Sequence, residues 1–273
     1  AAQFRGGGRR RGGDRMMKPR ARPQPQEFGE AWELLFGPAI AHRGLWTPDG
    51  APENSLGAFQ AACAGGYGIE LDVQITADGE AVVFHDYGLE RMTGAEGRLS
   101  DRALHDLRAL RLKGTDEGIP TLAEVLVEVG HRAMIHIELK TPFGEVGPLE
   151  KRVSEVLLDH NGPTCIIGFN PYSHAWFADH HPQILRGLDS YQWADDGARH
   201  LSPEIRKSMA NLEQVEIARP DFLALERGML PWDRAQAFRD QGMPIIAWTV
   251  RTEKEVERLR PHVDNVIFEG FAA

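Results

Sequence analysis

The sequence predicts an α/β protein, a single (β/α)8 barrel of the TIM-barrel class. From residue 36 onward, short runs of β-branched and apolar residues alternate with segments of helical periodicity. Nine such runs in a chain of 273 residues fit eight barrel strands and one extra strand. An open doubly wound sheet is the competing fold, but the chain lacks the GxGxxG and GxxxxGKS loops that usually follow the first strand of such sheets.

The expected elements follow one another in chain order. Strands are expected at residues 39–44, 68–76, 81–86, 133–140, 165–170, 184–190, 222–226, 244–250 and 265–270. Helices are expected near residues 54–65, 100–111, 121–129, 147–160, 171–179, 202–214, 232–241 and 252–260. Helix ends are indicated by three N-cap residues and one stop residue, which are Asn54, Ser100, Thr121 and Gly242.

A tight turn at Asp78-Gly79 joins the second and third strands. Such a turn connects antiparallel strands, so one strand of the pair belongs to a short hairpin insertion rather than to the barrel. With a two-residue loop, Asp72 lies opposite His85, and their side chains share one face. A slip of one residue in this register would turn His85 to the other face.

The chain divides into a basic, Arg/Gly-rich extension, residues 1–35, and one barrel domain, residues 36–273. We expect the extension to be disordered, with non-specific RNA contact as an alternative role. Residues 1–27 hold eight basic and two acidic residues, whereas the rest holds 23 basic and 38 acidic residues. A body this acidic offers no basic face for nucleic acid, and an anionic substrate would need local cations or a metal.

The cysteine content and hydropathy bear on the compartment. Cys63 and Cys165 lie far apart and lack a metal-type spacing, which favours a reducing environment. No run of about 18 apolar residues is present, so no transmembrane helix is expected. The amino terminus is basic but lacks the apolar segment of a signal peptide. These features predict a cytoplasmic protein.

Titratable residues lie at the carboxyl ends of four successive strands, where barrel active sites form: His42, Arg43, Glu70, Asp72, His85, Asp86, Glu138 and Lys140. Glu70, Asp72 and Glu138 supply three carboxylates, which are the ligands that Mg²⁺ or Ca²⁺ prefers. Without a cation, three converging negative charges would repel one another. The alternative is three separate ion pairs with nearby Arg or Lys residues.

His42 and His85 are the candidate acid and base, since an ordinary imidazole titrates near pH 6.5. Two histidines can serve opposite sides of one phosphorus atom. Arg43 offers a planar fork for two phosphate oxygens, and Lys140 offers a point charge. Either cation could instead only neutralise the carboxylates.

Three more residues on strands are candidates for the interior or the mouth of the barrel. Trp248 and Phe169 end later strands, where they either line a pocket or plug the barrel. His136 shares a strand face with Glu138, and we expect it to pack inside the barrel, with a supporting role at the site as the alternative.

The ordered motifs of the chain resemble those of the glycerophosphodiester phosphodiesterase family, in its bacterial form. They cover roughly residues 39–270 and are HRG (42–44), PENS (52–55), IELDV (69–73), TADG (76–79), VVFHD (82–86), IPTL (119–122), IELK (137–140) and WTV (248–250). The resemblance implies a (β/α) barrel enzyme that hydrolyses glycerophosphodiesters, small molecules, to glycerol 3-phosphate and an alcohol. It also implies one divalent cation on Glu70, Asp72 and Glu138.

The resemblance further assigns roles to single residues. It implies that His42 and His85 are catalytic and that Arg43, Lys140, Glu53 and Trp248 bind the substrate. Arg43 and Lys140 would contact the phosphate, Glu53 would lie near the metal or the glycerol hydroxyls, and Trp248 would line the pocket.

The chain departs from the family pattern at two places. Gly168-Phe169 stands where members often have Ser-Phe, and Phe268-Glu269 stands where they often have Thr-Asp. Neither position belongs to the metal or histidine set, so we expect these departures to bear on the substrate rather than on the reaction. The competing functions are a lysophospholipase D with an apolar mouth near residues 171–177, and a barrel that binds without catalysis.

Overall fold

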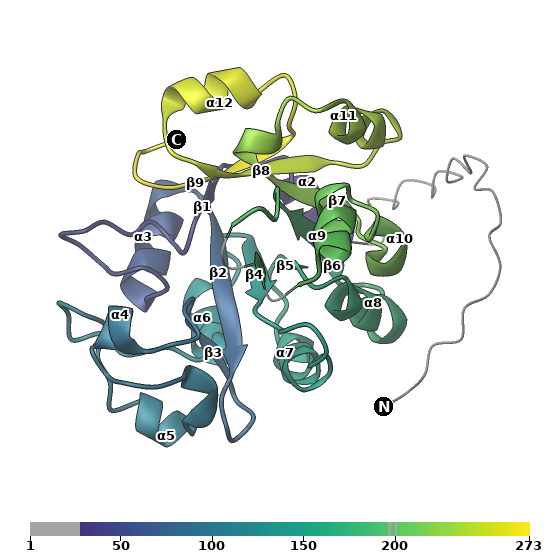
Figure 1. The fold of residues 1–273 in the computed structure, drawn as a ribbon. Coiled ribbons are helices and arrows are strands. Elements are labelled where there is room, and N and C mark those ends of the chain that lie inside the picture. The colour runs from purple at the N-terminus through teal and green to yellow at the C-terminus, as the bar shows by residue number, and fades with distance from the viewer. Residues whose placement is uncertain (1–27, 196–197, 200) are drawn as a thin grey trace, which may run out of the picture.

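The computed structural model describes residues 28–195, 198–199 and 201–273. Eight parallel strands close into a barrel, because β1 pairs with both β2 and β9 (Figure 1). These strands are β1 (Ile40–Ala41), β2 (Gly68–Ile75), β4 (Ile135–Leu139), β5 (Thr164–Gly168), β6 (Leu185–Ser190), β7 (Phe222–Glu226), β8 (Ile245–Val250) and β9 (Asn265–Phe268). The predicted (β/α)8 fold is confirmed, with β3 (Ala81–Val83) as the extra strand.

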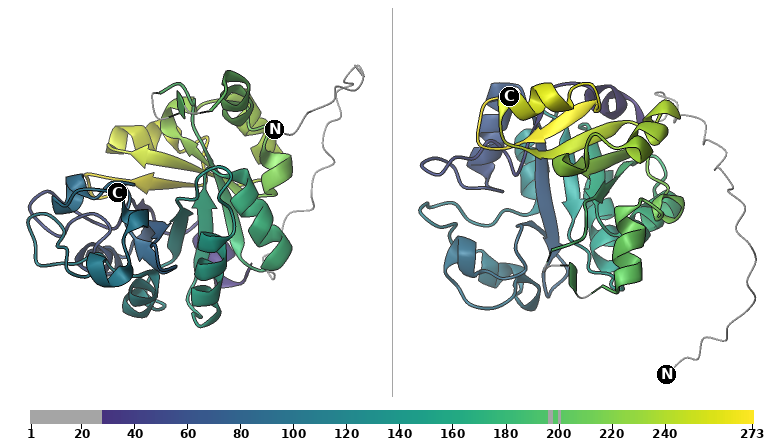
Figure 2. Two further views of the ribbon diagram at one scale, coloured as in Figure 1. Left: turned by 60° about the horizontal axis from the view of Figure 1, so that its bottom comes forward. Right: turned by 45° about the horizontal axis from the view of Figure 1, so that its top comes forward.

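Helices lie outside the barrel and connect its strands (Figure 2). Seven expected helices are present as α3 (Leu56–Gly65), α6 (Leu122–Val129), α7 (Pro148–Leu158), α8 (Pro171–His180), α9 (Pro203–Ala210), α11 (Asp233–Asp240) and α12 (Glu253–Leu259). The short helices α2 (Glu30–Leu34), α4 (Glu90–Thr93) and α10 (Val215–Ala218) had no clear signal in the sequence. None of the helices in the described part of the chain combines the length and the apolar character needed to span a bilayer.

Helix ends follow the expected capping chemistry at two of four positions. The Thr121 side chain accepts the Glu124 N–H in a capping box, and Gly242 follows α11 with a φ of 88°. The cap predicted at Asn54 was wrong, because Ser55 caps α3. The cap predicted at Ser100 was also wrong, because that residue lies within a 3₁₀ turn.

The hairpin between β2 and β3 has a loop of residues 77–79, one residue longer than expected. Gly79 adopts a φ of 84°, as a loop of this length requires of its last residue. The predicted register was therefore wrong: Phe84, not His85, lies opposite Asp72 and donates its N–H to the Asp72 carbonyl at 2.9 Å. His85 nevertheless lines the site cavity, because the pairing with β2 ends at Phe84 and the chain bends at His85.

The segment after β3 is a larger insertion than a hairpin. It contains α4, the 3₁₀ turn Leu99–Asp101 and α5 (Leu104–Leu107), which lie beside β2 and β3 in Figure 1. The expected helix over residues 100–111 is broken because the backbone is extended at Arg102. The insertion buries its own apolar cluster, formed by Val82, Phe84, Leu89, Leu99, Leu107, Leu112 and Ile119.

The amino-terminal end of the barrel interior is covered by residues 28–35. Phe28, Trp32 and Leu35 pack with apolar residues of the strands, and Asn265 at the start of β9 donates to the Leu35 carbonyl at 3.1 Å. The packed domain therefore begins by Phe28, earlier than the boundary expected at residue 36. The rest of the expected extension, with its alternative of RNA contact, lies outside the described residues.

Candidate active site

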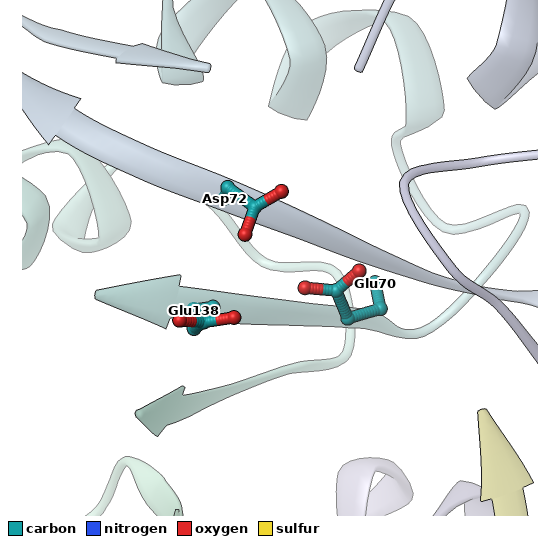
Figure 3. Close-up of side chains that lie close together, drawn as sticks. All are labelled: Glu70, Asp72 and Glu138. Atoms are coloured by element: carbon teal, nitrogen blue, oxygen red, sulfur yellow. The ribbon is translucent and has the colours of Figure 1, made fainter. Parts of the chain in front are cut away.

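Three carboxylates meet where the middle of β2 lies beside the carboxyl end of β4. Glu70 and Asp72 are two residues apart on β2, so they share a face, and the parallel register places Asp72 beside Glu138 on β4. Each offers one oxygen that lies within 4.8 Å of the others (Figure 3). All three are buried, with at most 8% exposed.

Two cations accompany the three carboxylates. Lys140 Nζ lies 2.8 Å from Asp72 Oδ1 and 2.6 Å from Glu138 Oε1, and Arg43 Nε lies 3.3 Å from Asp72 Oδ2. Glu70 instead accepts the backbone N–H of Arg43 at 3.0 Å. The separate ion pairs considered from the sequence thus exist only in part, because Lys140 is shared and one negative charge stays in excess.

The electrostatics of the cluster favour an added cation. Burial and the neighbouring Asp72 and Glu138 charges raise the pKa of Glu70, and burial raises the pKa of Glu138 to about 7 despite Lys140. Burial also opposes ionisation of Asp72, but Lys140 and other nearby positive charges outweigh it and lower that pKa. Among the described residues, no group donates to Glu70 Oε1. This all-oxygen donor set fits a hard divalent cation.

His42 follows β1 and lies between two carboxylates. Its Nδ1 is 2.5 Å from Glu269 Oε2, and its Nε2 is 3.9 Å from Glu70 Oε2. The hydrogen bond to His42 outweighs burial and lowers the pKa of Glu269, and Arg251 Nη2 lies 3.5 Å from Glu269 Oε1. Glu269 therefore contacts a candidate catalytic histidine. We had expected this departure from the family pattern to affect substrate choice and not the reaction.

His85 follows β3 and has a similar partner. Its Nδ1 lies 2.6 Å from Asp86 Oδ1, and Arg91 of α4 holds the other oxygen of Asp86 at 2.5 Å. Burial, followed by the Lys140 charge, lowers the pKa of His85 and favours the neutral ring. The insertion thus positions one histidine of the site.

Arg91 also connects the insertion to the loop between β1 and α3. Its Nη2 lies 2.6 Å from Glu53 Oε1, and the same oxygen accepts from Arg43 Nη1 at 2.9 Å. The paired arginines outweigh burial and lower the pKa of Glu53. Glu53 therefore aligns Arg43 beside the carboxylates. Arg91 was not among the residues singled out from the sequence, because it follows no strand.

Asn54 supports the cluster rather than capping a helix. Its side chain donates to Asp72 Oδ2 at 2.8 Å and accepts the Asp72 N–H at 3.3 Å. Its φ of 57° is left-handed, a conformation that Asn tolerates better than most residues. The choice of Asn in the PENS motif was the only local signal for this role.

A cavity of about 1080 Å³ opens beside these groups at the carboxyl ends of the strands. His85, Glu138 and Lys140 line one part of it, and Trp248 lines another together with Phe169. Phe169 and Trp248 therefore line the pocket and do not plug the barrel, which was the alternative considered from the sequence. His136 lies buried in the barrel, where its Nδ1 is 3.3 Å from the Ile69 carbonyl oxygen, as the packing interpretation requires.

Asp189 on β6 is a buried carboxylate that the sequence did not single out. Burial, reinforced by the Glu138 charge, raises its pKa well above the ordinary value. Asp189 lies on the same face of β6 as Leu185, which packs in the barrel interior, and it interacts electrostatically with Glu138, Lys140 and Asp72. The run ILRGLDS alone gave no indication of this position.

Comparison with known proteins identifies the class of this site. Residues 42–269 match the model of the glycerophosphoryl diester phosphodiesterase family. The chain belongs to this family. A glycerophosphodiester phosphodiesterase from Caldanaerobacter subterraneus is 30% identical over 249 residues, which cover 84% of this chain and 92% of that protein. Glycerophosphodiester phosphodiesterase 1 from Mus musculus is 42% identical over 253 residues, covering 83% of this chain and 76% of that protein.

Solved structures of family members have the same barrel. A Thermotoga maritima glycerophosphodiester phosphodiesterase has a TM-score of 0.66 at 26% identity, covering 85% of this chain and 94% of that one. An Oleispira antarctica phosphodiesterase, solved with the product sn-glycerol-3-phosphate, has a TM-score of 0.74 at 24% identity, covering 87% and 94%. Membership of the family confirms the resemblance and the enzyme class predicted from the motifs.

Proposed function

We propose that the protein hydrolyses glycerophosphodiesters to sn-glycerol 3-phosphate and an alcohol by two-histidine acid–base catalysis at a divalent cation site. One observation carries this proposal: His42 and His85 each hold Nδ1 against a carboxylate, beside a shared cluster of acidic residues. That arrangement fixes each ring and directs its second nitrogen to the substrate.

The cytoplasm is the proposed compartment, supported by the unpaired state of Cys63 and Cys165.

Glu70, Asp72 and Glu138 would hold the cation, which we propose to be Mg²⁺ or Ca²⁺ because all donors are carboxylate oxygens. When bound, the cation supplies a Lewis acid that polarises a phosphate oxygen and acidifies a nearby hydroxyl. Arg43 and Lys140 add positive charge for the phosphate, and Glu53 keeps the Arg43 fork in place. Trp248 lines the pocket beside them.

The histidines carry the protons of the reaction. One histidine accepts the proton of the attacking hydroxyl, from water or from the glycerol, at Nε2. The new P–O bond forms as the bond to the alcohol breaks, and the other histidine donates its Nε2 proton to the leaving oxygen. With water as the nucleophile this step gives glycerol 3-phosphate directly. With the glycerol hydroxyl it gives a cyclic phosphate, which a water then opens to glycerol 3-phosphate while the two histidines exchange roles. Such acid–base catalysis contributes roughly 10²- to 10⁴-fold. Glu269 and Asp86 position the two rings throughout.

The test is release of glycerol 3-phosphate from glycerophosphocholine and glycerophosphoethanolamine, with EDTA and with Mg²⁺ or Ca²⁺ restored. We expect EDTA to abolish release and one cation to restore it. His42→Ala and His85→Ala should each lower kcat by about 10²- to 10⁴-fold. His105→Ala is the matched control, because that side chain is 82% exposed on α5 and does not line the cavity.

A second candidate activity is supported by the aromatic lining of the cavity. Phe169, Tyr191 and Trp248 form an apolar surface that an acyl chain could contact, as a lysophospholipase D would require. Release of lysophosphatidic acid from a lysophospholipid tests this activity. No cleavage of either kind of substrate with any added cation would leave only the non-catalytic binding barrel.

A further inference from the structure

A wall of five aromatic side chains lines the cavity beside the proposed catalytic groups. These residues, termed the aromatic wall, are Phe143, Phe169, Tyr191, Trp193 and Trp248. The Phe169 ring meets those of Tyr191, Trp193 and Trp248 edge-on, with centroids 5.6–5.7 Å apart. The rings come from the ends of several strands, so the barrel brings them together.

The wall is held firmly. Trp193 is 5% exposed, its ring lies 4.4 Å from that of Tyr191, and its Nε1 donates to Ser190 Oγ at 3.3 Å. Phe169 and Tyr191 are half-buried and face the cavity. A rigid, partly exposed set of rings is a surface built for a ligand rather than a closed core.

The charges of the cavity differ between two arcs of the barrel. On the β3–β4 side its basic groups are His85, Arg98 and Lys140, and the two carboxylates of that side, Asp86 and Glu138, already pair with His85 and Lys140. Asp195, after β6, and Glu226, at the end of β7, are carboxylates on the side of the aromatic wall, and Arg227 Nη1 lies 3.8 Å from Glu226 Oε1. A ligand with a negative phosphate and a positive group at its other end matches this division.

We propose that the aromatic wall, with Asp195 and Glu226, is a subsite for a quaternary ammonium group on the alcohol half of the substrate. This inference rests on the proposed function and specifies its substrate class: choline-type diesters. Aromatic faces attract weakly hydrated cations, and quaternary ammonium groups have no N–H that burial would leave unpaired. The carboxylates add long-range attraction in a partly desolvated space.

Other alcohols fit this surface less well. A primary ammonium group, as in ethanolamine, carries the same charge but would lose strong hydration against the rings. A neutral polyol such as glycerol or inositol gains nothing from the two carboxylates beyond hydrogen bonds. An acyl chain would use the rings but not the charges. The choline group itself can belong to a water-soluble diester or to a lysophospholipid.

The test compares kcat/KM within matched pairs. The water-soluble pair is glycerophosphocholine and glycerophosphoethanolamine, and the lipid pair is lysophosphatidylcholine and lysophosphatidylethanolamine. We expect kcat/KM to be about 10-fold higher for the choline compound than for the ethanolamine compound in at least one pair. The pair that shows this preference indicates whether the choline group belongs to a water-soluble diester or to a lysophospholipid. In Tyr191→Leu and in Asp195→Asn the choline-to-ethanolamine ratio should fall several-fold. Tyr172→Leu, an exposed aromatic residue on α8, should keep the parent ratio.

Binding of tetramethylammonium, followed by tryptophan fluorescence, gives a readout that does not depend on turnover. Saturable quenching that weakens in Tyr191→Leu supports the subsite. Equal kcat/KM within both pairs, or tetramethylammonium binding that neither substitution changes, would overturn it. If no diester is hydrolysed, the proposed function fails, whereas the fluorescence titration still decides the subsite.

Discussion

The two histidines of the site differ in their surroundings but share one arrangement. His42 meets Glu269 from β9, and His85 meets Asp86, its own neighbour in the chain. In each case the carboxylate takes Nδ1 and so leaves Nε2 for the proton transfer that we propose. The partner of His85 is visible in the HD dipeptide, whereas the partner of His42 lies 227 residues away.

The Glu269 contact leads to a prediction at this scale. In Glu269→Gln the ring of His42 loses its charged partner, and we expect kcat to fall by roughly 10- to 100-fold, less than the 10²- to 10⁴-fold loss expected when the histidine itself is removed. Steady-state hydrolysis of glycerophosphocholine measures the change. Glu253→Gln, on the exposed start of α12, is the control and should behave like the parent. A Glu269→Gln enzyme with unchanged kcat would remove the positioning role.

Among the elements, α2 shows how a weak local signal becomes part of the core. The helix has only five residues, too few to be stable alone. It persists because Phe28, Ala31, Trp32 and Leu35 are buried against the amino-terminal ends of the strands. The carboxylates lie toward the opposite end of the barrel. The helix α2 therefore covers the amino-terminal end of the barrel and leaves the end with the candidate site open.

The packing of α2 predicts the effect of two neighbouring aromatic substitutions. Trp32 is 7% exposed, so Trp32→Ala should lower the free energy of unfolding by about 3–5 kcal/mol. Phe36 is 44% exposed, so Phe36→Ala should cost less than about 1 kcal/mol. Urea denaturation of both variants measures the difference. If Trp32→Ala lowered the free energy of unfolding as little as Phe36→Ala is expected to, α2 would not be packed in the folded domain.

The whole molecule buries several titratable groups, and their charges link its stability to solution conditions. The carboxylates of the site repel one another in the absence of an added cation. His174 on α8 is also buried, with Nε2 2.9 Å from the Gly168 carbonyl oxygen. Burial lowers the pKa of His174 from 6.5 to about 4. The folded state therefore favours the neutral ring.

The pH dependence follows from the direction of that shift. Between pH 6.5 and pH 4 the unfolded chain binds a proton at His174 that the folded chain does not, so stability is full above pH 6.5 and declines as pH falls to 4. The loss from this one group is about 3 kcal/mol. Urea unfolding at several pH values should show a shallower slope for His174→Gln than for the parent. His180→Gln, an exposed histidine, should keep the parent slope.

Cation binding should stabilise the whole fold. Mg²⁺ or Ca²⁺ at about 100 times its Kd should raise the free energy of unfolding by about 2.7 kcal/mol, because it binds the folded cluster and not the unfolded chain. Thermal unfolding with EDTA and with each cation measures this shift. Glu70→Gln should lose it, whereas Glu216→Gln, on the exposed face of α10, should retain it. A Tm that no cation changes would contradict the proposed site.

The strands and most helices were predictable because their signals are local. Apolar runs of strand length, the spacing of Glu70 and Asp72, and the capping box at Thr121 all depend on backbone geometry within a few residues. The hairpin register was missed because a single extra loop residue, allowed by Gly79, shifts every pair. The single helix predicted over residues 100–111 was wrong because packing within the insertion overrode its propensity.

The sequence by itself therefore determined the barrel, the strand ends that carry its chemistry and the family motifs, since each is written in short-range spacing. Only the tertiary structure decided that Glu269 meets His42, that Arg91 joins Glu53 to Asp86, and that five distant aromatic residues form one wall. The Glu269–His42 contact arises when β9 pairs with β1 and the barrel closes, whereas the Arg91 contacts and the aromatic wall depend on how the loops after several strands pack together. Closure sets distances between residues far apart in the chain, and no local pattern encodes them.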